Sequence, residues 1–291
     1  MEFRPVMDQH GNGAPPAVEM RGIVKRFPGV VANNGIEFAV RQGEIHALLG
    51  ENGAGKTTLM NILFGLYHQD EGEIRVNGQP VRFGNAREAV QAGLAMVHQH
   101  FMLIPRFTVT ENVILGSEGS GVVLDRVEAS ARVAELGAHY GLQVDPDAVV
   151  GDLPVGMQQR VEILRALYQG GKTLILDEPT ALLTPQEVDE LYVVLNRLRE
   201  SGDTIIFITH KLPEVAAISD RVTVIHRGRT VGTRETAETT ASLLAEMMVG
   251  RAVSLRVDRP PGHPGEPVLV ASDLHVKGSQ GHEALAGVNL E

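Results

Sequence analysis

The sequence of 291 residues contains no cysteine, which excludes a disulfide framework and any thiol chemistry. It also lacks an apolar run close to the roughly 20 residues that a membrane-spanning helix needs. Residues 1–16 are polar, with Gly and Pro, and have no apolar core of a signal peptide, so we expect a flexible tail there. The formal net charge of −10 argues against non-specific nucleic-acid binding. What remains is a chain long enough to bury a large hydrophobic core.

The most informative segment is the glycine-rich stretch at residues 50–58, GENGAGKTT. Residues 44–49 before it have the apolar pattern of a buried strand, and residues 59–64 after it have the single apolar face of a helix. Strand, glycine loop, Lys-Thr and helix are the context of a phosphate-binding loop. The alternative is a glycine-rich turn that carries a surface lysine. The surrounding pattern favours a site for a nucleoside triphosphate.

The chemistry of such a loop depends on its backbone. Glycines allow successive N–H groups to point inward as an anion nest, and the helix that follows adds the positive end of its dipole. The lysine reaches the terminal phosphates, and the first threonine hydroxyl can ligate Mg²⁺. We therefore expect the phosphates to be held by Gly50, Glu51, Asn52, Gly53, Ala54, Gly55, Lys56, Thr57 and Thr58.

A second chemical segment, residues 173–180, reads TLILDEPT. Its apolar strand delivers two adjacent carboxylates to the strand's C-terminal end. Asp177 is expected to hold Mg²⁺, directly or through water. Glu178 lies where a base could polarise an attacking water. A solvated turn or a helix cap is the alternative for this acidic pair.

Together these segments resemble the ATP-binding subunit of ABC transporters, and further motifs occur in that family's order. The resemblance implies that Gln99 contacts Mg²⁺ and faces a transmembrane partner, and that residues 153–160, LPVGMQQR, are the signature motif with Gly156 facing a phosphate. It also implies that His210 contacts the γ-phosphate. Phe27 matches the aromatic residue that stacks on adenine.

Each of these motif residues has a structural alternative. A lone glutamine such as Gln99 is often a surface residue, and His210 alone could be a histidine satisfied near a strand end. Phe27 could be a core residue. For Thr184, in the segment that matches the D-loop, we favour a helix cap, because TPQE is a capping box with proline at the first helical position.

The resemblance implies an α/β fold, that of a P-loop NTPase of the ABC ATPase type, over residues 17–255. It has a mostly parallel core sheet, an antiparallel β subdomain and a helical subdomain at about residues 100–165. Alternating short strands are expected in 18–49 and an Asn-Gly hairpin in 73–83. The remaining expected elements are strands 173–177, 204–208 and 221–226, and helices 158–168, 185–200 and one from an N-cap at Asp125 to near Gly141.

The C-terminal part suggests a repeat. Residues 256–267 form a Pro/Gly-rich linker. Residues 268–291 then repeat the strand–turn pattern of the N-terminus, with Gly287 following Gly35 by 252 positions (287 − 35). Two unrelated strand–turn patterns are the alternative. Because tandem ATPase chains of simple-sugar and nucleoside importers have this layout, we expect a piece of a chain about twice as long, with 268–291 as the start of a second ABC domain and poorly packed.

The signature motif departs from the family's Leu-Ser-Gly-Gly-Gln. Pro154 has neither the serine hydroxyl nor an N–H, and Val155 replaces a glycine. ABC sites are composite, one domain's phosphate loop meeting the other's signature. Our hypothesis is that this signature faces a weakened loop in the second domain, so the 291-residue chain binds ATP but hydrolyses it poorly.

The implied function is ATP binding and hydrolysis with Mg²⁺, powering import of nucleosides or simple sugars. The implied partners are transmembrane permease subunits, a second ABC domain and, indirectly, an extracytoplasmic solute-binding protein, with no nucleic acid. The expected location is the cytoplasmic face of the membrane, reached through the permease. Residues 98–105 and 155–164 resemble the nucleoside branch most. Alternatives are a soluble ribosome-associated tandem ABC protein, usually with a long charged linker, and an exporter ATPase.

Overall fold

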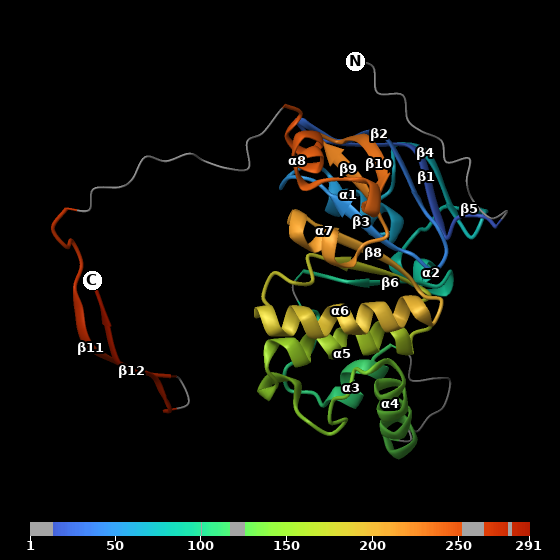
Figure 1. Ribbon diagram of the computed structural model, residues 1–291. Helices are drawn as coiled ribbons and strands as arrows, with labels where there is room; N and C mark the ends of the chain where they lie inside the picture. The colour runs from blue at the N-terminus through green and yellow to red at the C-terminus, as the bar shows by residue number, and fades with distance from the viewer. Residues whose placement is uncertain (1–13, 100, 117–125, 252–264, 279–280) are drawn as a thin grey trace. The chain divides into compact units, whose positions relative to one another are not determined.

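The computed structural model describes residues 14–99, 101–116, 126–251, 265–278 and 281–291 (Figure 1). The chain forms two units, one up to Val253 and one from Ser254 to Glu291. Residues 1–13, most of the linker and Asp125 lie outside the described residues, so the structure does not bear on the expected tail, linker or N-cap.

A six-stranded sheet forms the centre of the first unit, in the order β10-β9-β3-β8-β7-β6. Its strands are β3 (Ile45–Leu49), β6 (Leu94–Val97), β7 (Thr173–Asp177), β8 (Thr204–Thr209), β9 (Arg221–His226) and β10 (Arg229–Glu235). All neighbours pair in parallel except β10, which is antiparallel to β9. Four of the strands, β3, β7, β8 and the edge strand β6, are buried along their whole length, as expected for parallel strands covered on both faces.

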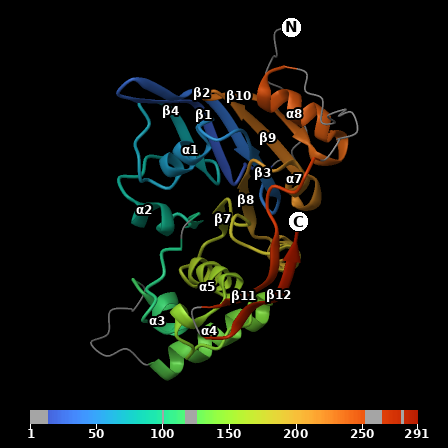
Figure 2. The ribbon, with the colours of Figure 1, turned by 90° about the vertical axis from the view of Figure 1, so that its left-hand side faces the viewer.

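Alternate residues of the central strands supply two separate cores. In β8, Ile206 and Ile208 pack with the antiparallel sheet and α1, whereas Ile205 and Phe207 pack with the helices on the other face. The helices are α1 (Lys56–Leu63), α2 (Ala86–Gln91), α6 (Pro185–Glu200), α7 (Leu212–Ile218) and α8 (Ala241–Val249), with 3₁₀ turns at Val150–Asp152 and Thr236–Glu238. Figure 2 shows the sheet edge-on between these layers.

The antiparallel sheet has the order β2-β1-β4-β5. Its strands are β1 (Val18–Phe27), β2 (Val30–Val40), β4 (Glu71–Val76) and β5 (Gln79–Val81). The expectation of short strands in 18–49 is wrong: β1 and β2 have 10 and 11 residues, and bulges at their register shifts keep the long ribbon twisted. The Asn-Gly hairpin is confirmed, with Asn77 and Gly78 at φ 50° and 79°.

The helical subdomain comprises α3 (Val109–Ile114), α4 (Arg126–Tyr140) and α5 (Val155–Tyr168). Figure 1 shows these helices together at one end of the core sheet, beneath α6. The helix expected over 158–168 begins earlier, at Val155, because Pro154 acts as its N-cap residue. The capping box of Thr184 and Glu187 at the start of α6 is confirmed, with reciprocal hydrogen bonds.

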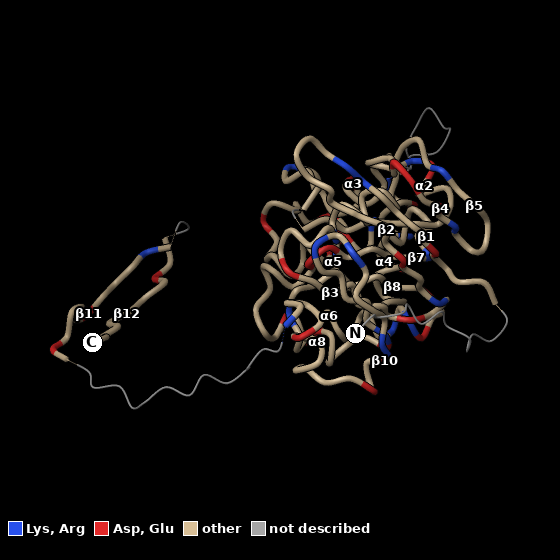
Figure 3. Tube along the Cα trace, turned by 90° about the horizontal axis from the view of Figure 1, so that it is seen from above, with Lys and Arg blue, Asp and Glu red and all other residues tan. Residues whose placement is uncertain are grey.

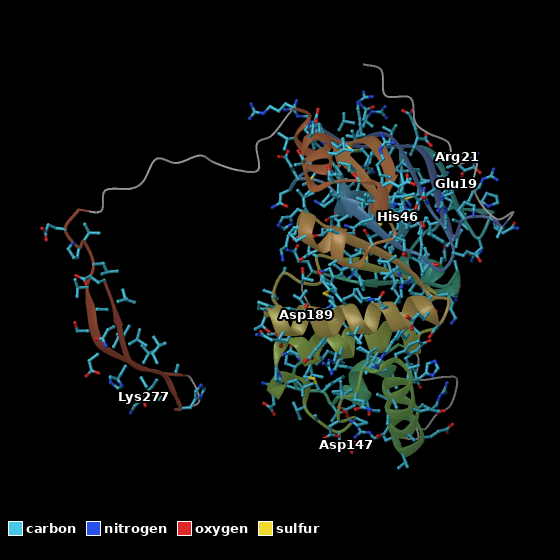
Figure 4. All side chains as sticks on the ribbon, in the orientation of Figure 1. Glu19, Arg21, His46, Asp147, Asp189 and Lys277 are labelled. Atoms are coloured by element: carbon cyan, nitrogen blue, oxygen red, sulfur yellow. The ribbon has the colours of Figure 1, made fainter. Side chains whose placement is uncertain are left out.

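Charged residues of both signs are interspersed along the trace of the first unit in Figure 3. Several form ion pairs on the antiparallel sheet, such as Arg21 with Glu19, labelled in Figure 4, and Arg75 with Glu73. Exposed pairs of this kind contribute about 0–1 kcal/mol each. The apolar cores therefore account for most of the stability.

The second unit is a single antiparallel hairpin of β11 (Ala271–Lys277) and β12 (Glu283–Leu290). Its pairing reproduces that of β1 and β2. The pairs Met20↔Phe38, Ile23↔Ile36, Lys25↔Asn33 and Arg26↔Val31 correspond to Ala271↔Leu290, Leu274↔Val288, Val276↔Leu285 and Lys277↔Glu283. The offset is constant, 251 positions in the first strand (271 − 20) and 252 in the second (290 − 38).

The irregularities of the two hairpins correspond as well. Gly22 at φ 60° corresponds to Asp273 at φ 54°, and Gly35 at φ 74° to Gly287 at φ 66°. The N–H of Gly22 donates to Oε1 of Glu37 at 2.9 Å, and the N–H of Asp273 donates to Oδ1 of Asn289 at the same distance. The two hairpins thus share their register, the positions of their bulges and one side-chain contact.

Burial distinguishes the hairpins. Ile23 and Phe38 are buried in the first, whereas Leu274 and Leu290 of the second are 38% and 47% exposed. Among the described residues, no helix combines the length and the apolar character needed to cross a bilayer.

Candidate functional site

The candidate site lies at the carboxyl edge of the core sheet. Three parallel neighbours, β3, β8 and β7, end there, and each is followed by one of the predicted segments. The phosphate loop follows β3, Glu178 follows β7 and His210 follows β8. Because parallel strands bring their carboxyl ends to one edge, the topology places the phosphate loop beside two segments that follow it by more than a hundred residues.

The phosphate loop has the backbone that its glycines predict. Gly53 and Gly55 have φ values of 79° and 101°, and a Cβ on Gly55 would lie 2.4 Å from the carbonyl oxygen of Ala32. Gly50 is packed as tightly, since its Cβ would lie 2.4 Å from the carbonyl oxygen of Ile225. Only glycine fits these two packed positions, and α1 starts directly after Gly55.

Lys56 lies under this loop and is 5% exposed. Its Nζ donates to the carbonyl oxygens of Gly50 at 2.8 Å and Glu51 at 3.0 Å. Burial lowers the pKa of Lys56, while the charges of Glu178 and Asp177 act in the opposite direction. The ammonium group is thus held at the bottom of the loop by two backbone carbonyls.

Asp177, at the end of β7, is 4% exposed. Burial raises its pKa, and a hydrogen bond with Thr57 acts in the opposite direction. This pairing brings together two of the three side chains predicted to contact Mg²⁺, the third being Gln99. Mg²⁺ in nucleotide sites keeps several waters and takes one or two protein ligands in addition to phosphate oxygens, so this donor pair fits the ion. The described residues contain no group of three or more His, Asp or Glu side chains that could hold a metal without such phosphates.

Glu178 adopts φ 48°, an uncommon left-handed conformation for a non-glycine residue. Its Oε1 lies 2.9 Å from Nδ1 of His210, and its Oε2 accepts a long 3.5 Å contact from Nε2 of Gln99. Strained backbone of this kind costs about 1–3 kcal/mol and persists only where the surroundings enforce it. The structure thus brings together the three residues predicted to act in catalysis.

An open cavity of about 620 Å³ connects most of the predicted nucleotide contacts. It is lined by Phe27, Val30, Val31, Ala32, Asn52, Gly53, Gly55, Lys56, Thr57, Thr58, Gln99, Glu178, Arg227 and Gly228. Five other predicted site residues do not line the cavity but bond to residues that do or to the phosphate loop. They are Gly50 and Glu51, which bond to Lys56, Asp177, which bonds to Thr57, His210, which contacts Glu178, and Ala54, whose N–H donates to the carbonyl of Glu51.

Phe27 is partly exposed and lies in this lining, not in the core. The edge of Tyr67 approaches it with ring centroids 5.5 Å apart, and Nζ of Lys25 lies 5.3 Å from its centroid. The location agrees with a base platform, although the neighbouring ring and cation show that Phe27 also has packing partners.

Gly156 does not join this cavity. It lies at the start of α5, beside a smaller cavity of about 250 Å³ between α5 and α6. Its N–H donates to Oε1 of Glu187 at 3.2 Å. The structure thus separates Gly156 from the other nucleotide contacts of this chain, as expected if a signature motif serves a second domain.

Comparison with known proteins agrees with this geometry. Residues 33–181 match the family model described as ABC transporter, which is slightly more than half of the chain. The chain belongs to the ABC transporter family. Its cassette has the fold of cbiO1 from Clostridium perfringens, part of the ABC transporter complex cbiONQ, with a TM-score of 0.69, 28% identity, and coverage of 81% of this chain and 93% of that one.

Two curated relatives are similar to this chain over nearly its whole length. The glucose import ATP-binding protein TsgD13 of Haloferax volcanii is 50% identical, covering 94% of this chain and 55% of the relative. The nucleoside import ATP-binding protein NupA of Lactococcus lactis is 48% identical, covering 94% of this chain and 54% of the relative. The chain thus spans about half the length of these relatives.

The sequence did not predict that Arg227 and Gly228 line the larger cavity, the one beside the phosphate loop. They form the turn between β9 and β10, with φ values of 48° and 72°, and the N–H of Gly228 donates to the carbonyl of Ala54 at 2.9 Å. The His-Arg-Gly sequence could have suggested a turn. Only the sheet order, which places β9 next to β3, brings that turn to the phosphate loop.

Proposed function

We propose that this chain contains the ATP-binding and ATP-hydrolysing cassette of an ABC importer, which powers uptake of nucleosides or simple sugars through a transmembrane permease. One observation carries the proposal. A single cavity is lined by Phe27, Lys56, Thr57, Gln99 and Glu178. In this proposal these residues would supply a base platform, a phosphate cradle, Mg²⁺ ligands and a base in one place.

In this mechanism Lys56 and the loop N–H groups would bind and neutralise the phosphates. Thr57, Asp177 and Gln99 would hold Mg²⁺, which when bound would offset the negative charge of the phosphates. Glu178 would orient and polarise the attacking water, and His210, which contacts Glu178, would respond to the γ-phosphate. Gln99, also in contact with Glu178, would transmit the state of the site to the permease.

Three features support a second ABC domain as the partner that completes the site. Gly156 lies away from the cavity, the hairpin β11–β12 repeats the register of β1–β2, and the glucose and nucleoside import relatives are about twice as long. In this proposal the exposed apolar residues of β11–β12 belong to the core of that domain, and 256–267 is the linker. The chain would then act at the cytoplasmic face of the membrane, bound to permease subunits and indirectly served by a solute-binding protein.

Nucleosides and simple sugars remain joint candidates for the cargo. The glucose and nucleoside import relatives have nearly equal identities, and the subunit that hydrolyses ATP does not touch what is carried. The ribosome-associated and exporter alternatives have no observation in their favour.

The first test is calorimetric titration of the purified 291-residue chain with ATP and Mg²⁺. We expect saturable binding and slow turnover. Steady hydrolysis that Glu178→Gln abolishes would contradict the composite-site part of the proposal, and absence of ATP binding would contradict the function itself.

The second test is a gentle pull-down of the tagged chain from detergent-solubilised membranes of its source cells. Recovery of polytopic permeases together with the chain supports the importer. Recovery of ribosomes instead would favour the soluble alternative.

A further inference from the structure

A buried carboxylate connects the two loops that carry Glu178 and His210. Glu214, in α7, is 7% exposed. Its Oε1 accepts a short hydrogen bond from the hydroxyl of Thr180 and an ion pair from Nζ of Lys211 at 3.0 Å. Its Oε2 accepts from the hydroxyl of Thr209 at 2.6 Å. One side chain thus contacts both loops.

The partners of Glu214 lie immediately beside the predicted catalytic residues. Thr180 is two positions after Glu178, and Thr209 and Lys211 flank His210. Glu214 itself contacts neither Glu178 nor His210 in the hydrogen bonds and ion pairs found among the described residues, and it is absent from the cavity lining. The direct contacts of Glu214 therefore connect it to the site through the two loops.

The hydrogen bonds leave little freedom in this cluster. The hydroxyl of Thr209 accepts the N–H of Lys211 at 3.0 Å, and the hydroxyl of Thr180 accepts from Nζ of Lys211 at 3.2 Å. Each hydroxyl has one proton, and both protons point to Glu214. A charged acceptor with two oxygens is therefore required between the loops, and a neutral amide would place a donor against a donor.

Holding the two loops together matters because the contact between His210 and Glu178 depends on the relative position of these loops. The 2.9 Å approach of His210 to Glu178 joins residues from two strands, and Glu178 has the strained φ of 48° that only enforcing surroundings maintain. Catalytic groups need to be held within about 0.5 Å of their productive positions by neighbours that are themselves fixed.

We propose that Glu214 is a positioning residue that holds the loop of His210 against the loop of Glu178. It does so through its contacts with Thr180, Thr209 and Lys211. The proposal rests on the proposed function for its catalytic consequence. Its structural part, the placement of His210, is independent of that function.

The test compares Glu214→Gln with Glu44→Gln in the 291-residue chain. Glu44 is an equally suitable control because it is 6% exposed and accepts hydrogen bonds from the Arg41 N–H and from His46. It precedes β3, at the opposite end of the strand from the phosphate loop, next to the buried His46 labelled in Figure 4.

The first readout is the imidazole signal of His210 in carbon–proton NMR spectra, assigned with His210→Gln. A reference spectrum of Glu178→Ala gives the position of this signal without its carboxylate partner. In Glu214→Gln the signal is expected to move towards that reference position, whereas in Glu44→Gln it stays at the wild-type position. An unchanged signal in Glu214→Gln, or an equal change in the control, overturns the proposal.

The second readout is nucleotide binding. Because His210 is expected to meet the γ-phosphate, Glu214→Gln should reduce the ratio of ATP to ADP affinity about tenfold, the effect of one charge-assisted hydrogen bond, and leave ADP affinity unchanged. Equal losses for both nucleotides would indicate a structural role only. Failure of the wild type to bind ATP contradicts the proposed function instead, and the NMR result still decides the placement.

Poor folding of Glu214→Gln would not end the test. Thr180→Val and Thr209→Val each remove one hydroxyl and keep a side chain of similar shape, so each loosens one side of the cluster. Both are expected to shift the His210 signal in the same direction, by less than Glu214→Gln does. Two folded valine variants with wild-type His210 signals would overturn the proposal.

Discussion

The phosphate-loop region and the signature region of this cassette differ in what their polar groups face. The signature region here comprises the start of α5 and the start of α6, which contact each other through Gly156 and Glu187. Around the phosphate loop, the residues Lys56, Thr57, Gln99 and Glu178 line one open cavity. At the start of α5, the N–H of Gly156 already donates to Glu187, and Nε2 of Gln158 donates to the carbonyl of Leu153. One region is arranged for a ligand, and the other is largely satisfied from within.

The difference shows what each region can contribute to a composite site. The phosphate loop keeps every residue type that its chemistry requires. The signature region has lost a hydroxyl and an N–H at Pro154, and a carboxylate lies where the α5 N-terminus could face a phosphate. We therefore expect substitutions in the first region to change nucleotide binding strongly, and substitutions in the second to act mainly on stability.

The largest effect is expected from Lys56→Ala. Removing one partner of a buried charge pair costs about 2–5 kcal/mol, so ATP affinity should fall about 30-fold to several thousand-fold. Calorimetric titration measures the loss. Lys172→Ala is the matched control, because Lys172 is an exposed lysine paired with Asp203 outside the cavity and should leave affinity unchanged.

Phe27→Ala comes next. Stacking of a base on an aromatic ring contributes about 1–3 kcal/mol, so ATP affinity should fall about 5- to 150-fold, while Phe27→Tyr keeps it. The same titration and a melting curve separate the two roles of the ring. A lower melting temperature with unchanged ATP affinity would show that Phe27 acts by packing on Tyr67 instead.

Much of this first region was predictable from sequence, for a physical reason. The phosphate loop is local: the glycines, Lys56 and Thr57 all lie within residues 50–57, so their geometry follows from the backbone they specify. Four strands of the core sheet, β3, β7, β8 and β9, were also predictable, because most of them are nearly continuous apolar runs, whereas β6 and β10 were not predicted. Arg227 and Glu214 were missed, because their roles depend on which strands become neighbours and on which side chains meet across loops.

In the signature region, features that depend on neighbouring residues were predictable and contacts between distant residues were not. The Thr184 capping box is local and was predicted correctly. The contact between Glu187 and Gly156 joins two helices 31 residues apart, and no sequence pattern indicates it. Similarly, the glycine spacing suggested a relation between β1–β2 and β11–β12, but their matching register depends on strand pairing that no sequence pattern indicates.

Thr184→Ala tests whether this region acts on stability. Loss of an N-cap side chain costs about 0.5–2 kcal/mol, so the free energy of unfolding should fall by that amount while ATP affinity stays unchanged. Thr108→Ala, which removes the same kind of capping box from α3, should give a comparable loss. Denaturant titration measures both, and a specific loss of ATP affinity in Thr184→Ala would contradict the division between the regions.

Glu187→Gln is expected to have a smaller, pH-dependent effect. Hydrogen bonds from the N–H and hydroxyl of Thr184 lower the pKa of Glu187 in the folded chain. The stabilisation is therefore present above the pKa of the unfolded chain and is lost as the pH falls through the lower folded pKa. Denaturant titrations at a series of pH values should show the variant less stable at neutral pH and the difference vanishing in acid. A difference that persists in acid would assign the effect to shape, not charge.

Pro154→Ser should change least. A serine restores the family's hydroxyl at the N-cap of α5, but the N–H of Gly156 remains bonded to Glu187 and the 291-residue chain's own cavity lies elsewhere. ATP affinity is expected to stay within about twofold of the wild type, since surface substitutions away from a ligand usually have effects within about 0.5 kcal/mol. The informative comparison is with the double variant Pro154→Ser, Glu187→Gln. If hydrolysis rises only when both changes are present, the internal carboxylate, and not the missing hydroxyl alone, keeps this half-site inactive.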